Sequence, residues 1–262
     1  MDLSRLLGPR SVAVVGASER AGSYGGEVLL NLARMGFPGE VVAVNPRRES
    51  VHGVPCVPAL TSAVDAVVVA VPPDSVPGVV AAAGELGCGG AVVLSAGFAE
   101  GTGTGADAQR ALVAAALTHD LPLCGPNGNG IVCVPARVAL WGDGVPALAP
   151  GPVALVSQSG NLAVNALASR RGLRLHTVVS TGNQAVLDAA DFVEALAGQD
   201  GVRAIALYLE HDGDGGRWCT ALERCARAGV GVAVLKAGSS PAGAAAARSH
   251  TGALAGDQRV VR

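Results

Sequence analysis

The sequence Ser11-Val12-Ala13-Val14-Val15-Gly16-Ala17-Ser18 decides the fold, because its apolar run ends abruptly in a glycine. Such a run is typical of a buried strand, and the glycines at positions 22, 25 and 26 predict a loop that leads into a helix over residues 27–35. A strand, a glycine loop and a helix form the first half of a β-α-β unit. The same alternation continues along the chain, which predicts an α/β fold with mainly parallel, doubly wound sheets.

The alternation divides the chain into two units. In the first unit we expect strands over residues 41–44, 66–71, 91–94 and 121–124, and helices over residues 76–86 and 106–119. Residues 131–151 are rich in proline and glycine and interrupt the pattern, so we predict one domain over residues 1–149 and a second over residues 150–262. In the second we expect strands over 153–156, 177–179, 204–209 and 232–235, and helices over 162–168, 188–196 and 217–228.

The composition excludes several classes of function. Half of the 262 residues are hydrophobic but only 3% are aromatic, so valine, alanine and leucine must fill the core, as in parallel sheets. The net charge of −2 offers no basic surface for nucleic acid or membrane lipid. No apolar run approaches ~20 residues and the N-terminus lacks a secretory signal, so we expect a cytosolic protein. The six cysteines contain no C-x-x-C pair, which predicts reduced thiols and no metal site.

The ends of the strands of the first unit predict a nucleotide site, since doubly wound sheets bind ligands beyond the carboxyl ends of their strands. A nicotinamide site usually has an acid after the second strand, whereas this chain has Arg47 and Arg48. Two guanidinium groups suit a ribose phosphate and predict coenzyme A or NADP; the alternative is a pair of solvated surface arginines. The predicted site residues are Gly16, Ala17, Ser18, Asn45, Pro46, Arg47, Arg48, Pro72, Ser95, Ala96, Gly97 and Asn127.

A second anion site is predicted at the start of the second unit. There the strand over residues 153–156 runs into Ser157, Gln158, Ser159, Gly160 and Asn161, and a helix follows. Small residues at a helix N-terminus leave amide groups free, and the positive end of the helix dipole points at the ligand. These five residues are therefore predicted to hold a phosphate group.

Near the end of the chain, His250 lies among small and hydroxyl-bearing residues that include Thr251 and Gly252. An imidazole can carry a phosphoryl group if a carboxylate orients it and amide donors neutralise the phosphate. Glu210 follows a predicted strand and is the expected carboxylate. Lys236 follows the next strand and is expected either to contact the phosphate or to form an ion pair. The alternative is that His250 is a solvated loop residue.

A series of short motifs links these sites. In order along the chain they are Gly16-Ala17-Ser18, Val44-Asn45-Pro46, Ser95-Ala96-Gly97-Phe98, Gly125-Pro126-Asn127, Ser157-Gln158-Ser159-Gly160, Gly182-Asn183, Leu207-Tyr208-Leu209-Glu210 and Ser249-His250-Thr251-Gly252. Together they closely resemble the nucleoside-diphosphate-forming (ADP-forming) acyl-CoA synthetases, which are related to the α subunit of succinyl-CoA synthetase. The resemblance covers essentially the whole chain.

The resemblance implies a Rossmann-like CoA-binding domain followed by a flavodoxin-like, succinyl-CoA-synthetase-type domain. It implies that His250 is transiently phosphorylated, that Glu210 supports it, and that residues 157–161 bind phosphate. Ser18, Pro46, Arg47 and Ser95 match the family's CoA-contacting loops. The reaction implied is reversible and joins a carboxylic acid to CoA while ATP is converted to ADP and phosphate.

The family also implies partners that this chain does not contain. ATP and Mg²⁺ bind an ATP-grasp unit in the family, and no stretch of this sequence resembles one. We therefore expect an oligomer with an ATP-grasp subunit, or an ATP-grasp domain in a longer polypeptide, because family members continue past Gly256. The alternatives are a non-catalytic acyl-CoA sensor that regulates a fused or bound enzyme such as an acetyltransferase, and an NADP-dependent oxidoreductase.

Some positions depart from the family pattern. Gly128 and Asn129 follow the motif Gly125-Pro126-Asn127, where the family usually has cysteine or serine and then an apolar residue. Gln184 and Val186 replace residues that are commonly charged. These departures leave open which acid is the substrate. The intact His250 and Glu210 favour the ligase over the sensor, and the second domain disfavours the oxidoreductase.

Overall fold

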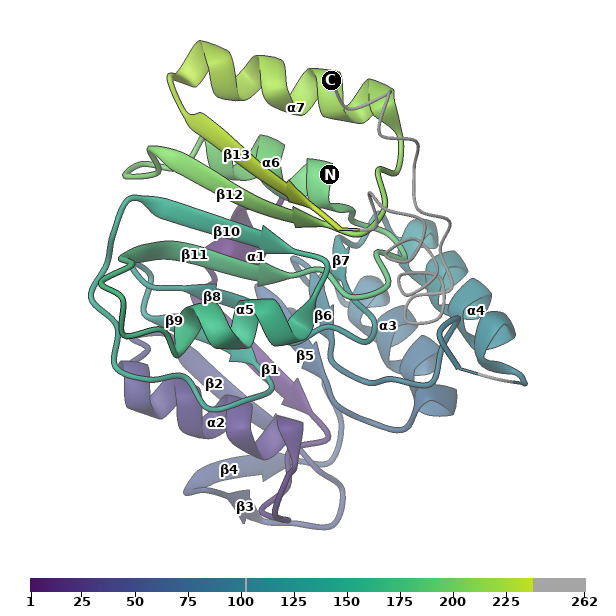
Figure 1. Ribbon diagram of the computed structural model, residues 1–262. Coiled ribbons are helices and arrows are strands. Elements are labelled where there is room, and N and C mark those ends of the chain that lie inside the picture. The colour runs from purple at the N-terminus through teal and green to yellow at the C-terminus, as the bar shows by residue number, and fades with distance from the viewer. Residues whose placement is uncertain (102, 238–262) are drawn as a thin grey trace.

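The computed structural model describes residues 1–101 and 103–237, which form two sheets with helices packed on them (Figure 1). The first sheet has seven strands in the order β3-β4-β2-β1-β5-β6-β7. All its pairings are parallel except that of β3 with β4. The strands are β1 (Ser11–Val15), β2 (Glu40–Val44), β3 (Ser50–Val51), β4 (Val54–Val57), β5 (Ala66–Val69), β6 (Ala91–Val93) and β7 (Leu123–Cys124).

The second sheet has six strands in the order β13-β12-β10-β11-β8-β9. Its strands are β8 (Gly130–Cys133), β9 (Val138–Trp141), β10 (Val153–Ser157), β11 (Leu175–Ser180), β12 (Ala204–Leu209) and β13 (Gly231–Lys236). Strands β10 to β13 are parallel, whereas β8 runs antiparallel to both β11 and β9. The predicted α/β class with two mainly parallel sheets is confirmed.

Helices connect the strands and cover the sheets. They are α1 (Ser4–Leu7), α2 (Tyr24–Met35), the 3-10 turn η1 (Pro73–Ser75), α3 (Val76–Glu85), α4 (Gly105–Thr118), α5 (Gly160–Leu167), α6 (Ala189–Ala197) and α7 (Gly215–Ala228). Helix α2 starts earlier than predicted because the Ser23 hydroxyl accepts a hydrogen bond from the amide of Gly26 and caps the helix. Within the described ranges, no helix has the length and apolar character that a membrane span requires, and the cytosolic location stays a prediction.

The position of β1 in the sheet explains why residues 12–15 are all apolar and do not alternate with polar residues. It pairs with β2 on one side and β5 on the other, and helices cover both faces. Val12 and Val14 belong to a core that includes α2, whereas Ala13 and Val15 belong to a core that includes α3 and α4. A strand buried on both faces needs apolar side chains at every position.

The antiparallel hairpin β8–β9 differs from the expectation for residues 131–151. Its strands are only four residues long, but Ile131, Leu140 and Trp141 are fully buried. The hairpin adds to β11 at the edge of the second sheet although it precedes residue 150. The break in the β-α alternation is therefore a hairpin and not a linker, and the division at residue 150 stays a prediction.

Asn31 of α2 connects the helix of the first sheet to this hairpin of the second. The side chain is fully buried. Its Nδ2 donates to the carbonyl oxygens of Trp141 at 3.0 Å and Asp143 at 2.7 Å, and its Oδ1 accepts from the amide of Val145 at 3.0 Å. One hydrophobic core also contains residues of α2, β1, β9 and β10. The two sheets therefore share a core and are held in one orientation.

We predict that Asn31→Leu lowers the free energy of unfolding by about 2–4 kcal/mol, because buried carbonyl and amide groups of the hairpin lose their partners. Urea denaturation measures the change. Asn165→Leu is the matched control, since Asn165 is exposed on α5 and bonds only to the carbonyl oxygen of Asn161; it should change the value by less than ~0.5 kcal/mol. Equal stabilities of the two variants would contradict the role given to Asn31.

Candidate functional site

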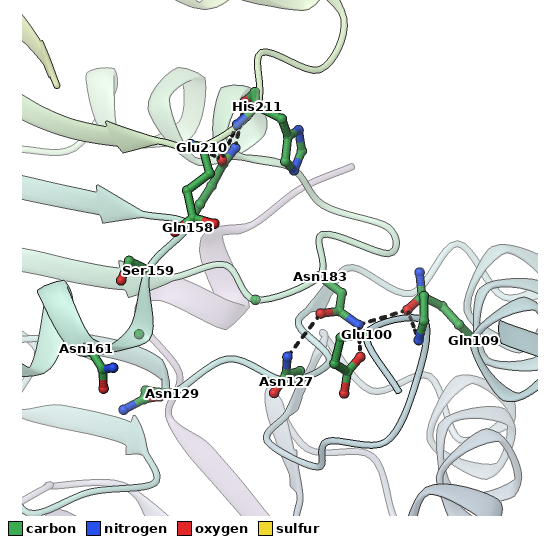
Figure 2. Close-up of a pocket in the computed structure, with 13 residues that line it drawn as sticks. Glu100, Gln109, Asn127, Asn129, Gln158, Ser159, Asn161, Asn183, Glu210 and His211 are labelled. Atoms are coloured by element: carbon green, nitrogen blue, oxygen red, sulfur yellow. Dashed lines mark hydrogen bonds between the residues drawn. The ribbon is translucent and has the colours of Figure 1, made fainter. Parts of the chain in front are cut away.

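Loops from both sheets surround a cavity of about 520 Å³ (Figure 2). They follow β6, β7, β10, β11 and β12, so the carboxyl ends of the two sheets open onto the same space, as the parallel-sheet rule predicts. The predicted site residues Asn127, Gln158, Ser159, Gly160, Asn161 and Glu210 all line it. The other lining residues are Ala99, Glu100, Gln109, Asn129, Gly182, Asn183 and His211.

The loop after β10 is built to present the start of α5 to this cavity. The hydroxyl of the buried Ser157 accepts from the amide of Ser159 at 3.1 Å and donates to its carbonyl oxygen at 2.8 Å. Ser159 in turn caps α5 by accepting from the amide of Leu162. A Cβ on Gly160 would lie 2.8 Å from Oδ1 of Asn129, so a larger residue there would displace the Asn129 side chain. Ser157 shapes the loop, and residues 159–161 face the cavity.

Gln158 fixes the loop that carries Glu210. Its Oε1 accepts from the amides of Glu210 at 2.6 Å and His211 at 3.0 Å, and its Nε2 donates to the carbonyl oxygen of His211 at 3.0 Å (Figure 2). Only 7% of Glu210 is exposed. The backbone that carries the Glu210 side chain is therefore fixed at the cavity wall. His250, Thr251 and Gly252 lie outside the described residues, so their roles stay predictions.

A polar network that the motif analysis missed joins the two sheets at the other side of the cavity. Oε1 of Glu100 accepts from the amide of Gly97 at 2.6 Å and that of Phe98 at 3.1 Å, and its Oε2 accepts from Nδ2 of Asn183. Asn183 also donates to Gln109 at 3.0 Å and accepts from Asn127 at 3.2 Å (Figure 2). The motifs contain Gly97, Phe98, Asn127 and Asn183, but Glu100 and Gln109 lie outside them and are far along the chain from Asn183.

These hydrogen bonds keep Glu100 ionised. Burial by itself raises the pKa of Glu100, but donation from Asn183 and from the amides of Gly97 and Phe98 outweighs it and leaves the pKa below its ordinary value. The network thus places a second carboxylate, besides Glu210, at the cavity wall.

Lys236 forms an ion pair with Asp212, which is the second of the two outcomes expected for it. Its side chain is only 9% exposed, and the residue does not line the cavity. Its contribution to phosphate binding stays a prediction.

The glycine loop after β1 lines a separate cavity of about 260 Å³. Gly16 has a φ of 91° and a Cβ there would lie 2.3 Å from the carbonyl oxygen of Ala70, so the turn requires glycine. The Asn45 side chain donates to the carbonyl oxygen of the buried Ala17 at 2.8 Å and stabilises the loop. Ser18 lines the cavity together with Glu19, Arg20, Ala21, Gly22, Ser23, Tyr24, Gly26, Glu27, Leu30, His52, Gly142, Asp143 and Gly144.

A small third cavity of about 60 Å³ lies between the other two. It shares Tyr24 and Gly142 with the Ser18 cavity, and Asn127 and Asn129 with the Glu210 cavity. Ala96 also lines it. The three cavities therefore lie next to one another along one path, from the glycine loop of the first sheet to the loop of residues 157–161 in the second.

The remaining predicted residues surround this path without lining it. Pro46, Arg47, Arg48, Pro72 and Gly97 are exposed. The amide of Arg47 donates to Oδ1 of Asn45 at 2.8 Å. The hydroxyl of the buried Ser95 donates to the carbonyl oxygen of Val71 at 2.6 Å, so Ser95 stabilises the loop after β5. Arg20 and His52, which do line the Ser18 cavity, were not predicted.

Comparison with known proteins identifies the two units. The model of a CoA binding domain matches residues 10–133, and that of the succinyl-CoA ligase like flavodoxin domain matches residues 150–262. The chain is 39% identical to ADP-forming acetate–CoA ligase I of Archaeoglobus fulgidus and 35% identical to subunit alpha of ADP-forming acetate–CoA ligase I of Pyrococcus furiosus, in each case over 99% of its length. The chain belongs to the ADP-forming acyl-CoA synthetase family. The predicted resemblance is confirmed.

The relatives are longer than this chain, which spans 38% of the A. fulgidus ligase and 58% of the P. furiosus subunit. A solved structure in the same family is the dinucleotide forming acetyl-coenzyme A synthetase 1 of Ca. Korarchaeum cryptofilum in complex with phosphate and ADP. It superimposes with a TM-score of 0.90 at 33% identity, over 99% of this chain and 57% of that one. The chain therefore has the fold of the CoA-binding and ligase-like part of these synthetases.

We predict that Glu100→Gln is less stable than the wild type at neutral pH and that the difference shrinks as the pH falls. The folded pKa of Glu100 lies below its ordinary value of 4.5, so the carboxylate stabilises the fold above that pH and loses this effect as it becomes protonated. Urea denaturation between about pH 6 and about pH 3.5 tests this. Glu85→Gln, at an exposed position of α3, is the control. A gap between Glu100→Gln and wild type that is independent of pH would contradict the account.

Proposed function

We propose that this chain is the CoA-binding and phosphohistidine-bearing part of an acid–CoA ligase. The reaction joins a carboxylic acid to CoA as ATP is converted to ADP and phosphate, and it is reversible. The main support is the row of neighbouring cavities that leads from the glycine loop at Ser18 to the cavity of Glu210. A long, thin thiol such as CoA can follow such a path, with its nucleotide at one end and its reactive sulfur at the other.

In this proposal, residues at the carboxyl ends of the first sheet's strands bind CoA. The nucleotide lies at the Ser18 cavity, with its 3′-phosphate toward Arg47 and Arg48, two exposed guanidinium groups that follow β2. The pantetheine arm passes Tyr24 and Ala96, so the sulfur reaches the cavity beside Asn127. The loops that carry Gly16, Asn45, Pro72, Ser95 and Gly97 shape this path.

In this proposal, residues of the second domain accept and transfer the phosphoryl group. His250 takes it as a phosphohistidine, while Glu210 stabilises the positive charge that develops on the imidazole. Amides at the start of α5, at residues 159–161, receive the phosphate oxygens, helped by Thr251 and Gly252. A carboxylate oxygen of the acid then attacks the phosphorus and frees the imidazole. Finally the CoA sulfur attacks the acyl phosphate carbon, and phosphate leaves.

In this proposal, an ATP-grasp partner binds ATP and Mg²⁺. The support is the coverage of the relatives: the P. furiosus relative is named as a subunit alpha, and the longer A. fulgidus relative extends well beyond the matched part. The partner is a separate subunit or a further domain, and the working enzyme is an oligomer or a longer chain. The identity of the acid is open, since relatives are named for acetate, 4-hydroxybutyrate and trans-feruloyl-CoA.

We predict that His250 becomes phosphorylated when the chain is mixed with its ATP-grasp partner, ATP and Mg²⁺, and not with ATP alone. His250→Asn should abolish the label and leave CoA binding intact. Glu210→Gln should slow labelling by about 10²-fold or more, because an amide cannot stabilise the developing imidazolium, a loss of ~2–4 kcal/mol. The assay is acid-labile, base-stable incorporation of phosphate from labelled ATP.

His119→Asn is the control for histidine loss, since His119 ends α4 and does not line the cavity. It should label at the wild-type rate. If the wild type takes up no label with a competent partner, or if His250→Asn labels as well as the wild type, the ligase proposal is wrong. In that outcome, retained CoA binding would favour an acyl-CoA sensor.

A further inference from the structure

His211 is a histidine of the Glu210 cavity to which neither the motifs nor the proposed reaction assigns a role. It directly follows Glu210, lines the cavity and is partly buried. Gln158 holds its backbone through both the amide and the carbonyl group. The imidazole is thus attached to a fixed segment of backbone.

The hydrogen bonds of Gln184 determine the tautomer of this imidazole. Oε1 of Gln184 accepts from the amide of Ala189, the first residue of α6, at 2.7 Å. This bond orients the carboxamide, so its NH₂ group faces Nε2 of His211 at 2.9 Å. An amide nitrogen only donates, so Nε2 must accept, and the single proton of a neutral imidazole lies on Nδ1.

The surroundings also favour the neutral ring. Burial lowers the pKa of His211 below its ordinary value, against the opposing effect of Glu210 and Asp212 on the same loop and of Asp188 at the start of α6. Lys236 on β13 lowers it further. A proton on Nε2 would in addition face the NH₂ group of Gln184. The imidazole is therefore neutral at physiological pH, with one N–H group at Nδ1.

The cavity needs donors of this kind. Among the described residues that line it, none is lysine or arginine, whereas Glu100 and Glu210 are carboxylates. At this described part of the wall, neutral N–H and O–H groups are therefore the side-chain donors for a negatively charged ligand. Within the described part of the chain, the hydrogen bonds of His211 use Nε2 and the backbone, and none uses Nδ1.

We propose that His211 is an oxyanion-binding residue: its Nδ1–H donates to an oxygen of a phosphate or carboxylate in the cavity, and Gln184 is the positioning residue that fixes the tautomer. The nature of the ligand rests on the proposed function, but the tautomer does not. The same geometry separates His211 from the phosphoryl carrier. Its Nε2 lone pair is engaged by Gln184 and its Nδ1 is protonated, so neither nitrogen is available as a nucleophile.

Two variants at position 211 distinguish the effect of losing the N–H donor from the effect of losing the imidazole ring. In His211→Asn the side-chain NH₂ replaces Nδ1–H, whereas His211→Leu keeps the bulk and removes the donor. The probes are inorganic phosphate and acetate, titrated separately into the full chain and followed by the amide NMR signals of residues 159–161. We expect His211→Leu to weaken binding of at least one probe about 5- to 10-fold and His211→Asn to stay within about 2-fold of the wild type. Far-UV circular dichroism and urea denaturation confirm that both variants fold.

The choice of probe identifies the source of the oxyanion. A loss confined to phosphate assigns Nδ1–H to the phosphoryl group, a loss confined to acetate assigns it to the acid, and a loss of both assigns it to a position that the two share. Unchanged binding of both probes by His211→Leu would overturn the proposal. So would an equal loss in His211→Asn and His211→Leu.

The tautomer of His211 can be measured directly by NMR, without an activity assay. The ¹⁵N shifts of the His211 imidazole, assigned by their absence in His211→Asn, should show a protonated Nδ1 and an unprotonated Nε2 at pH 7. Gln184→Glu places an acceptor opposite Nε2 and should move the titration of His211 to higher pH, whereas Gln184→Met, which removes the donor without adding an acceptor, should move it less. A protonated Nε2 in the wild type would overturn the proposal, even if His250 is phosphorylated as proposed above.

Discussion

The contact of Asn31 with the hairpin β8–β9 is the constraint on which the site depends. A helix of the first sheet and an edge of the second are joined through one buried carboxamide that satisfies three backbone groups of the segment around Trp141 and Asp143. Because each sheet can bind a ligand only beyond the carboxyl ends of its own strands, a joint site requires that those ends point into the same space. The hairpin extends the second sheet toward α2 and so determines where the Glu210 loop lies relative to the Ser18 loop.

The electrostatics of the cavity follow from this arrangement. Its described wall holds two carboxylates, several carboxamides, a serine and a neutral histidine, with no fixed cation. Such a wall binds an anion through N–H groups and the dipole of α5, and it does not hold a phosphate as tightly as an arginine cluster would. Moderate binding suits the proposed reaction, in which a phosphoryl group leaves a histidine, reaches a carboxylate and then departs as free phosphate. The Glu100 and Asn183 network closes the opposite side, so the same polar groups that join the sheets also shape the cavity.

Much of the fold was predictable, because its elements are long, apolar and local. The run Val12 to Val15, buried on both faces, carries its signal within a few residues, whereas the serine caps that start α2 and α5 earlier than predicted were not recognised. The hairpin β8–β9 was not predictable, since its strands are four residues long and lie in a stretch rich in proline and glycine that resembles a linker. The loops with Gly16, Ser159 and Glu210 were located by the rule of strand ends. Glu100 and His211 were missed because the side chains that bind them from the loop before α6, Asn183 and Gln184, lie 83 and 27 positions away, respectively, a separation that no local motif encodes.

A crystal structure of the chain with CoA tests most directly whether the two sheets form one site. The account predicts the CoA sulfur in the cavity between Asn127 and Ser159, the pantetheine arm beside Tyr24, and the 3′-phosphate within reach of Arg47 or Arg48. Density for CoA along that path would join the nucleotide end of the first sheet to the phosphate loop of the second. A CoA molecule bound with its sulfur outside the Glu210 cavity, at either sheet alone, would contradict the account.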